Sequence, residues 1–173
     1  VDDLMITVRT ANERLLINAP FPCKIIELNG DVEDSPDLVN DDAYGVEMGG
    51  ALKNIYAIAC GIADGLNSGE NTVGMIMTRG LAEMSRLAIE LGANPQTFLG
   101  LSGVGDLITT CASPLSRNHR IGKCIGKGMS VAEAKIEIGQ TTEGLKTLKV
   151  VWEKAKEKGI NMPIVDSLYK IIY

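Results

Sequence analysis

The sequence predicts a mainly α-helical protein, preceded by a short irregular or β-containing N-terminal segment. Beyond residue 40, apolar side chains recur at three- and four-residue steps, which is the spacing of a buried helix face. Before that point, short apolar runs alternate with turn-forming residues, and the acidic, polar stretch NGDVEDSPDLVNDDAYG separates the two parts. We therefore expect an N-terminal segment at 1–40 and a helical domain at 41–173.

Composition excludes several classes of protein. The chain has 173 residues, of which 45% are hydrophobic and 23% charged, as in a soluble globular domain. A net charge of −5 and an aromatic content of 4% argue against a nucleic-acid surface. No apolar run reaches the roughly 18–20 residues of a membrane span. The start, VDDLMITVRT, lacks the basic and apolar regions of a signal peptide, so we expect a cytoplasmic protein.

The cysteines give no sign of a metal site. None of the four forms a CxxC pair, and His119 is the one histidine of the sequence. Neither zinc nor a disulfide framework is therefore expected. We expect small buried thiols in a reducing compartment, at Cys23, Cys60, Cys111 and Cys124.

Short strands are expected in the first part, at ITVRT (6–10) and CKIIEL (23–28), with a turn between them. The first helix, 45–66, is almost continuously apolar and should be central. Its glycines at 49, 50, 61 and 65 each weaken a helix by up to about 1 kcal/mol. We expect them to allow another backbone to pack closely.

The later helices have local start and stop signals. A second helix is expected at 71–91, and Asn94 should cap a short helix that begins at Pro95. The glycine-rich turn SGVGDLITTC then runs into a helix. The remaining helices are expected at 116–127, at 131–138 after the capping box SVAE, at 142–158 before Gly159, and from Pro163 onward. The last one ends in apolar residues, so we expect the natural protein to continue.

Lys53 interrupts the apolar helix. One interpretation is a lysine whose ammonium reaches the surface along its aliphatic stem. The other is an amine held in a cleft, where it exchanges protons with a substrate. In that case the adjacent Asn54 could orient a substrate hydroxyl or carbonyl.

Asp106 lies in GVGDLI, at an expected helix start. It is either a simple N-cap or a carboxylate paired with Lys53 or with a substrate hydroxyl. Thr109 and Thr110 follow one turn later and could add hydroxyl donors. GVGDLI is not a dinucleotide fingerprint, because it lacks the third glycine and no βαβ unit surrounds it.

SPLSRNHR places Ser116, Arg117 and Asn118 where a helix begins. A helix start with an arginine suits a phosphate monoester, although it can also be an ordinary basic helix start. His119 is expected to be a polar surface residue or a support for the site, not a catalyst. GQTTEG (139–144) is either a helix start capped by Thr141 or Thr142, or a loop that hydrogen-bonds a cofactor.

Together and in this order, four stretches closely resemble the C-terminal domain of the bacterial-type NAD(P)-dependent glycerol-3-phosphate dehydrogenases. They are GVEMGGALKNIYAIACGIADGL, TRGLAEMSRLAIELGANPQTFLGLSGVGDLITTC, SRNHRIG and GQTTEG. The resemblance covers roughly 41–173. It implies an all-helical domain like the C-terminal domain of 6-phosphogluconate dehydrogenase, which supplies the substrate half of the site beside a Rossmann domain.

The resemblance also implies the activity. Such enzymes interconvert dihydroxyacetone phosphate and sn-glycerol 3-phosphate with NADH or NADPH and feed phospholipid synthesis. A homodimer is the candidate assembly. By motif, the resemblance assigns the catalytic proton donor and acceptor to Lys53 and substrate contacts to Asn54, Asp106, Thr110, Ser116, Arg117 and Asn118. It assigns cofactor contacts to Arg117, Thr141 and Glu143.

Residues 1–40 contain no glycine fingerprint of a Rossmann domain. We therefore expect an isolated substrate domain that lacks most of its cofactor site, with 1–40 as a remnant of the cofactor domain or a segment of other origin. A non-catalytic helical module for binding or dimerisation is the alternative. Another hydroxyacid dehydrogenase with a phosphorylated substrate is a narrower one. Retention of Lys53, Asp106 and Arg117 together favours the enzyme domain.

Overall fold

A computed structural model describes residues 5–9, 14–18 and 42–173 of the chain. The chain divides into two compact units, Val1–Asp41 and Asp42–Tyr173. In the first, β1 (Met5–Arg9) and β2 (Arg14–Asn18) form a two-stranded antiparallel sheet in which Val8 lies opposite Leu15. β1 confirms the strand expected at 6–10. β2 was not expected, because its apolar run is short and does not alternate, and the strand expected at 23–28 lies outside the described residues.

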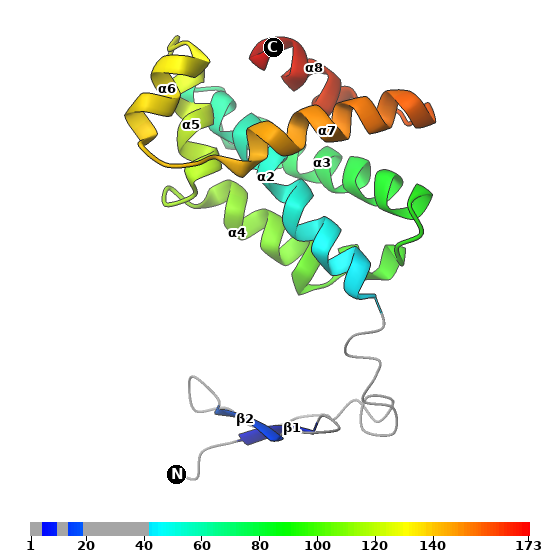
Figure 1. The fold of residues 1–173 in the computed structure, drawn as a ribbon. Coiled ribbons are helices and arrows are strands. Elements are labelled where there is room, and N and C mark those ends of the chain that lie inside the picture. The colour runs from blue at the N-terminus through cyan, green and yellow to red at the C-terminus, as the bar shows by residue number, and fades with distance from the viewer. Residues whose placement is uncertain (1–4, 10–13, 19–41) are drawn as a thin grey trace. The chain divides into compact units, whose positions relative to one another are not determined.

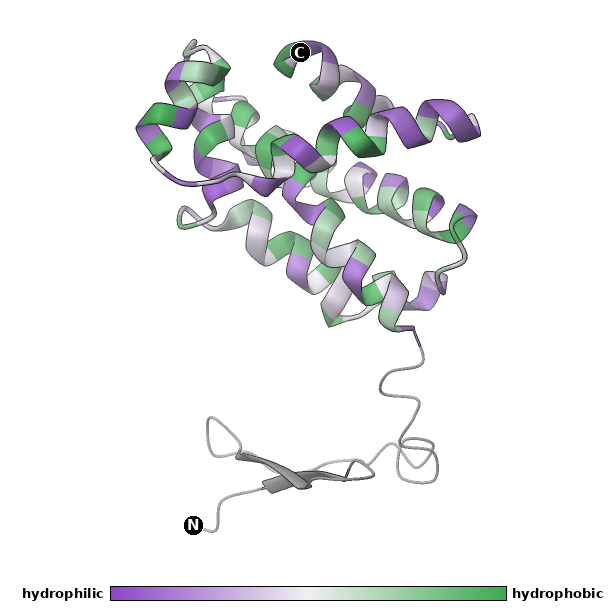
Figure 2. Cartoon of the chain, viewed as in Figure 1, coloured by the Kyte–Doolittle hydropathy of each residue, from purple (hydrophilic) through white to green (hydrophobic). Residues whose placement is uncertain are grey.

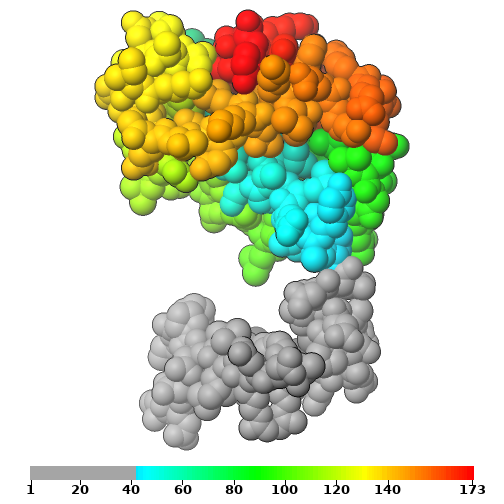
Figure 3. Space-filling model, viewed as in Figure 1, coloured from blue at the N-terminus to red at the C-terminus, as the bar shows by residue number. Residues whose placement is uncertain are grey.

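The second unit is helical, which confirms the mainly α fold class (Figure 1). In it, α2 packs against α3, α4, α5, α7 and α8. Figure 3 shows α7 lying across α2 on one face. The elements are α2 (Ala43–Gly65), α3 (Glu70–Glu90), the 3-10 helix η2 (Pro95–Leu99), the π-helical turn η3 (Leu101–Gly105), α4 (Asp106–Ala112), α5 (Arg117–Gly126), α6 (Val131–Ile138), α7 (Glu143–Lys158) and α8 (Pro163–Ile172).

Local signals account for most helix ends. The Asn94 side chain accepts from the backbone N–H of Gln96, and Ser130 and Glu133 form the expected capping box. Gly159 ends α7 with a φ of 68°, a conformation that favours glycine. α2 begins two residues earlier than expected because the Asp42 carboxylate caps it, accepting from Gly45 N at 2.9 Å.

The core forms along α2, whose residues from Ile55 to Cys60 are all buried. α7 is amphipathic, as expected. It alternates hydrophobic and hydrophilic residues along its length (Figure 2) and buries one face through Leu145, Leu148, Val151 and Ala155. Of the helices in the described residues, none is long and apolar enough to cross a bilayer.

Glycines bring α2 and α5 into backbone contact. A Cβ added at Gly61 would overlap the backbone of His119, and one at Gly122 would overlap the backbone of Ile58. One turn further on, a Cβ added at Gly65 would lie 2.5 Å from Lys123 O, and one added at Gly126 would lie 2.4 Å from Ile62 O. The expected close approach is therefore confirmed at Gly61 and Gly65.

A close approach of another backbone was also expected at Gly49 and Gly50, and the structure has it at Gly49 alone. At Gly49, an added Cβ would lie 2.7 Å from the carbonyl oxygen of Ser102 in η3. At Gly50, no atom lies within 4 Å of the added Cβ, so the expectation is wrong there.

Glu83 is a buried carboxyl group that joins three helices. Its side chain, on α3, accepts from Ile164 N at 2.7 Å and Val165 N at 3.3 Å, in the first turn of α8. It also accepts from the Tyr56 hydroxyl of α2 at 3.1 Å. Burial raises the pKa of Glu83 above its ordinary value of 4.5.

We expect Glu83→Ala to lower the free energy of unfolding by about 2–4 kcal/mol, because it leaves the buried Val165 N–H, the part-buried Ile164 N–H and the buried Tyr56 phenol without their acceptor. Urea unfolding measures the loss, with the exposed Glu90→Ala of the same helix as control. Since the folded-state pKa is raised, the difference between wild type and variant is largest in acid. It shrinks as the pH rises through that pKa. An equal loss in the two variants would contradict this role of Glu83.

Candidate active site

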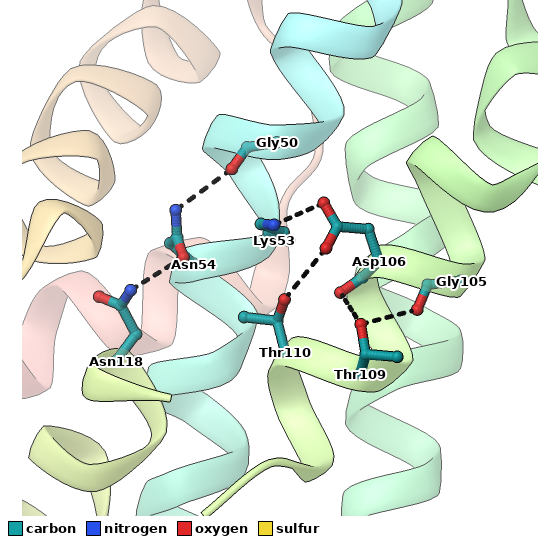
Figure 4. A network of polar contacts seen from close by, with 8 residues as sticks. All are labelled: Gly50, Lys53, Asn54, Gly105, Asp106, Thr109, Thr110 and Asn118. Atoms are coloured by element: carbon teal, nitrogen blue, oxygen red, sulfur yellow. Dashed lines mark hydrogen bonds and ion pairs between the residues drawn. The ribbon is translucent and has the colours of Figure 1, made fainter. Parts of the chain in front are cut away.

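Lys53 and Asp106 form an ion pair between α2 and α4 (Figure 4). The Lys53 Nζ lies 2.5 Å from Asp106 Oδ2, and the two side chains are 21% and 35% exposed. The ammonium is thus held by a carboxylate near the surface, and does not simply extend into water. A small ligand can still reach both groups.

The π-helical turn η3 places Asp106 inside the first turn of α4 and not at its cap position. Because LSGVG is already helical, Asp106 enters α4 with helical dihedral angles, and Gly105 occupies the cap position without a side-chain cap. The N-cap interpretation of Asp106 is therefore wrong. Its second oxygen accepts from Thr110 Oγ1 at 3.4 Å, whereas Thr109 donates to backbone carbonyls of its own helix.

Two asparagines, Asn54 and Asn118, form hydrogen bonds that join α2, α5 and α7 next to the Lys53–Asp106 ion pair. Asn118 Nδ2 donates to Asn54 Oδ1 at 2.8 Å, and Asn54 Nδ2 donates to Gly50 O at 3.2 Å (Figure 4). The Asn118 Oδ1 accepts from Gly144 N, at the start of α7, at 3.1 Å. The side chain of Asn118 is only 5% exposed. Through these two hydrogen bonds, its amide joins α5 to α2 and α7 beside Lys53.

Arg117 and Glu143 form a second, more exposed pair. Their side chains are 45% and 54% exposed, and Arg117 Nη2 lies 3.5 Å from Glu143 Oε1. Ser116 caps α5 by accepting from His119 N at 3.3 Å. The start of α5 therefore presents a guanidinium and a helix N-terminus, the two features that suit an anion.

Thr141 lies apart from these contacts. It is exposed, in the loop before α7, and lines a pocket of about 410 Å³ with neighbours such as Gln140 and Lys146. Thr142 occupies the cap position of α7 and is buried, but its side chain makes no cap hydrogen bond. The structure thus brings together Lys53 with Asp106, and Arg117 with Glu143, but leaves Thr141 outside both pairs.

Sequence reasoning missed the surroundings of His119. The side chain is 8% exposed, so the expected surface residue is wrong, whereas the other expectation, a support for the site, stays a prediction. Its ring contacts Asp64 of α2 and the backbone of Cys111 in α4. These contacts are tertiary, and no spacing in the sequence signals them. Within the described residues, no group of three His, Cys, Asp or Glu side chains lies close enough to hold a metal ion.

The chain matches a known protein family over its helical unit. Residues 42–173 match the family described as NAD-dependent glycerol-3-phosphate dehydrogenase C-terminus. Among curated proteins, it is 60% identical over 134 residues to glycerol-3-phosphate dehydrogenase (NAD(P)+) of Psychrobacter cryohalolentis, covering 78% of this chain and 31% of that protein. The protein of the same name from Teredinibacter turnerae is 59% identical over 134 residues, covering 78% and 39%. The chain spans about a third of the length of these relatives.

Solved structures agree with this match. The crystal structure of glycerol-3-phosphate dehydrogenase from Coxiella burnetii superposes with a TM-score of 0.75 and 40% identity, covering 82% of this chain and 47% of that one. The Saccharomyces cerevisiae glycerol-3-phosphate dehydrogenase superposes with a TM-score of 0.71 and 34% identity, covering 76% and 39%.

Fold and sequence define a helical C-terminal domain of a nicotinamide-dependent dehydrogenase. More closely, the chain belongs to the NAD-dependent glycerol-3-phosphate dehydrogenase C-terminal family.

Proposed function

We propose that this chain is the substrate domain of an enzyme that interconverts dihydroxyacetone phosphate and sn-glycerol 3-phosphate. The observation that carries the proposal is the Lys53–Asp106 pair, an accessible ammonium in a helix that is otherwise largely apolar. A lysine at such a position is costly unless it is paired or used, and here it is paired and still reachable. Family membership supplies the reaction that such an ammonium serves.

In the proposed reduction, Lys53 is the proton donor. When bound, NADH or NADPH would supply the hydride that the carbonyl carbon of the substrate receives. The carbonyl oxygen gains negative charge at that moment, and the Lys53 ammonium stabilises this charge and delivers a proton to it. Asp106 holds the ammonium in place, and Thr110 holds Asp106. In the reverse direction, the neutral amine accepts the hydroxyl proton.

The phosphate end of the substrate is assigned to the start of α5. The first N–H groups of a helix lack acceptors within the helix, and the Ser116 hydroxyl satisfies only one of them, that of His119. Arg117 adds a planar guanidinium that binds phosphate through two hydrogen bonds. Binding the phosphate here and the carbonyl at Lys53 fixes the substrate in one orientation. Asn54 and Asn118 are proposed as further substrate contacts through the second N–H of each side-chain amide, because every amide nitrogen and oxygen of the two already takes part in one hydrogen bond.

NAD or NADP is the proposed cofactor. The exposed Glu143 carboxylate, the Thr141 hydroxyl and Arg117 fit this group, since they can accept from and donate to ribose hydroxyls and the nicotinamide amide. We further propose a cytoplasmic enzyme of glycerophospholipid synthesis, with a homodimer as its assembly. Residues 1–40 remain a candidate remnant of the cofactor domain.

Binding of sn-glycerol 3-phosphate by the chain tests the phosphate assignment. We expect Arg117→Met to weaken it by roughly 10–100-fold, because a charge-assisted hydrogen-bond pair is lost. Arg120→Met, on an exposed position of the same helix, removes the same charge and should change binding little. NMR titration measures the affinity of each variant for sn-glycerol 3-phosphate. The same titration with glycerol measures binding of a ligand that lacks the phosphate. Equal losses in the two variants, or equal binding of glycerol, would contradict the assignment.

A further inference from the structure

The loop that connects α6 and α7 (Figure 1) borders a pocket that lies apart from both ion pairs of the candidate active site. The volume of this pocket is about 410 Å³, within the roughly 300–1,000 Å³ range of small-molecule sites. Its wall comes from α6, the loop and the first turns of α7, and includes Lys135, Thr142 and Lys146. A small ligand therefore has both space and polar groups here.

The pocket carries positive charge. Lys135 of α6 and Lys146 of α7 both line it, and among the described residues no carboxylate does. Neither lysine forms an ion pair with another residue of the part that the structure describes, unlike Lys53 and Lys123. Two cations without a partner, in a chain whose net charge is −5, favour an anion at this place.

Thr142 adds a hydroxyl that has no partner. The residue is 6% exposed, and within 42–173 its side chain makes no hydrogen bond, not even the usual one of a helix cap. In the same part of the chain, every fully buried side-chain nitrogen or oxygen does have a partner. The Thr142 hydroxyl is therefore not enclosed in the core but opens into the pocket that the residue lines. A nearly buried hydroxyl without a partner in the protein indicates a ligand that supplies one.

Backbone N–H groups surround this hydroxyl. Of residues 140–143, none donates its N–H to an acceptor within the described part of the chain, whereas the N–H of Gly144 is taken by Asn118. These groups lie in the loop and at the start of α7, a helix of 16 residues. The first N–H groups of a helix and its dipole both favour negative charge.

We propose that this pocket binds a phosphate group. Lys135 and Lys146 balance its charge, while the Thr142 hydroxyl and the N–H groups of residues 140–143 donate to its oxygens. A phosphate has more acceptor oxygens than a carboxylate and so suits donors that come from two helices and a loop. Its source is either the bound dinucleotide cofactor or a free phosphorylated small molecule. The site stands on this geometry, whereas the cofactor as its source rests on the proposed function.

Titration of the ¹⁵N-labelled chain with inorganic phosphate tests the site. We expect the backbone signals of residues 140–142 to shift until they saturate. Lys146→Met should weaken this binding roughly tenfold, because a charge-assisted contact is lost, and Thr142→Val should weaken it by roughly threefold or more. Lys149→Met removes the same charge from an exposed position of α7 outside the pocket, and should leave the affinity unchanged. Equal affinities in wild type, Lys146→Met and Thr142→Val, or no shift at 140–142, would overturn the site.

Two further ligands identify the source of the phosphate. NAD carries phosphates, and nicotinamide riboside has the same nicotinamide and ribose without them. If the pocket holds the cofactor, NAD shifts the signals of residues 140–142 and loses affinity in Lys146→Met, whereas nicotinamide riboside does not distinguish the two chains. If inorganic phosphate shifts these signals and NAD does not, the site holds a free phosphorylated molecule.

The same spectra separate this site from the proposed function. Phosphate that shifts only the signals at the start of α5, around Arg117, would overturn the site and leave the proposed function standing. Shifts at residues 140–142 without any at the start of α5 would support the site and contradict the assignment of the substrate phosphate to Arg117.

Discussion

Lys53→Met is expected to reduce the turnover of dihydroxyacetone phosphate by roughly 10²–10⁴-fold, the range that a lost general acid usually costs. The measurement is the loss of NADH absorbance in an intact dehydrogenase that carries this helical domain. Methionine keeps most of the length and apolar surface of the lysine stem but removes the ammonium. The developing charge on the substrate oxygen then has neither a positive neighbour nor a proton donor.

The fold should survive this substitution. Asp106 loses its partner, but its side chain is 35% exposed, so water can solvate the carboxylate. Thermal unfolding of the variant should therefore resemble that of wild type. Lys149→Met, at an exposed position of α7, removes one charge without touching the site and should retain turnover. Turnover of Lys53→Met close to that of this control would refute the proton-donor role.

Gly61→Ala is expected to lower the free energy of unfolding by about 2–3 kcal/mol, as overpacking usually does. The added Cβ would overlap the backbone of His119, and α2 and α5 cannot separate without disturbing the core on both sides. Alanine is the better helix former by up to about 1 kcal/mol, but this gain is smaller than the cost of the overlap. Urea unfolding, monitored by circular dichroism, measures the change.

The same helix provides a matched control. At Gly50, an added Cβ meets no atom within 4 Å, so Gly50→Ala carries the propensity gain without the overlap. Stability should rise by about 0.5–1 kcal/mol. If Gly61→Ala were as stable as Gly50→Ala, the close contact between α2 and α5 would not exist in solution.

Helix positions could be predicted from the sequence because their signals are local. Asn94 and the Ser130–Glu133 pair act within their own turn, and Gly159 ends α7 through its own dihedral angles. The π-helical turn before Asp106 could not be predicted in this way, because LSGVG carries no pattern that distinguishes it from an ordinary glycine-rich turn. With this turn in place, Asp106 is not the expected helix cap, and its carboxylate accepts a hydrogen bond from Lys53.

The sequence predicts which residues form the candidate site, but it does not predict how these residues contact one another. For Asp106, the sequence allows an N-cap, a pair with Lys53 or a contact with a substrate hydroxyl, and residue spacing alone cannot choose among them. The bond of Asn118 to Asn54 and the ion pair of Arg117 with Glu143 depend on how distant helices pack. The same holds for His119, whose ring is buried where α5 packs against α2 and α4.

The position of bound sn-glycerol 3-phosphate in a crystal of this chain tests the central claim most directly. The account predicts the phosphate within hydrogen-bond distance of Arg117 and the first turn of α5. It also predicts the C2 hydroxyl within hydrogen-bond distance of Lys53 Nζ. A ligand bound elsewhere, such as in the apolar pocket of about 540 Å³ lined by α2, α3 and α8, would contradict it, as would a ligand whose C2 oxygen lies away from Lys53.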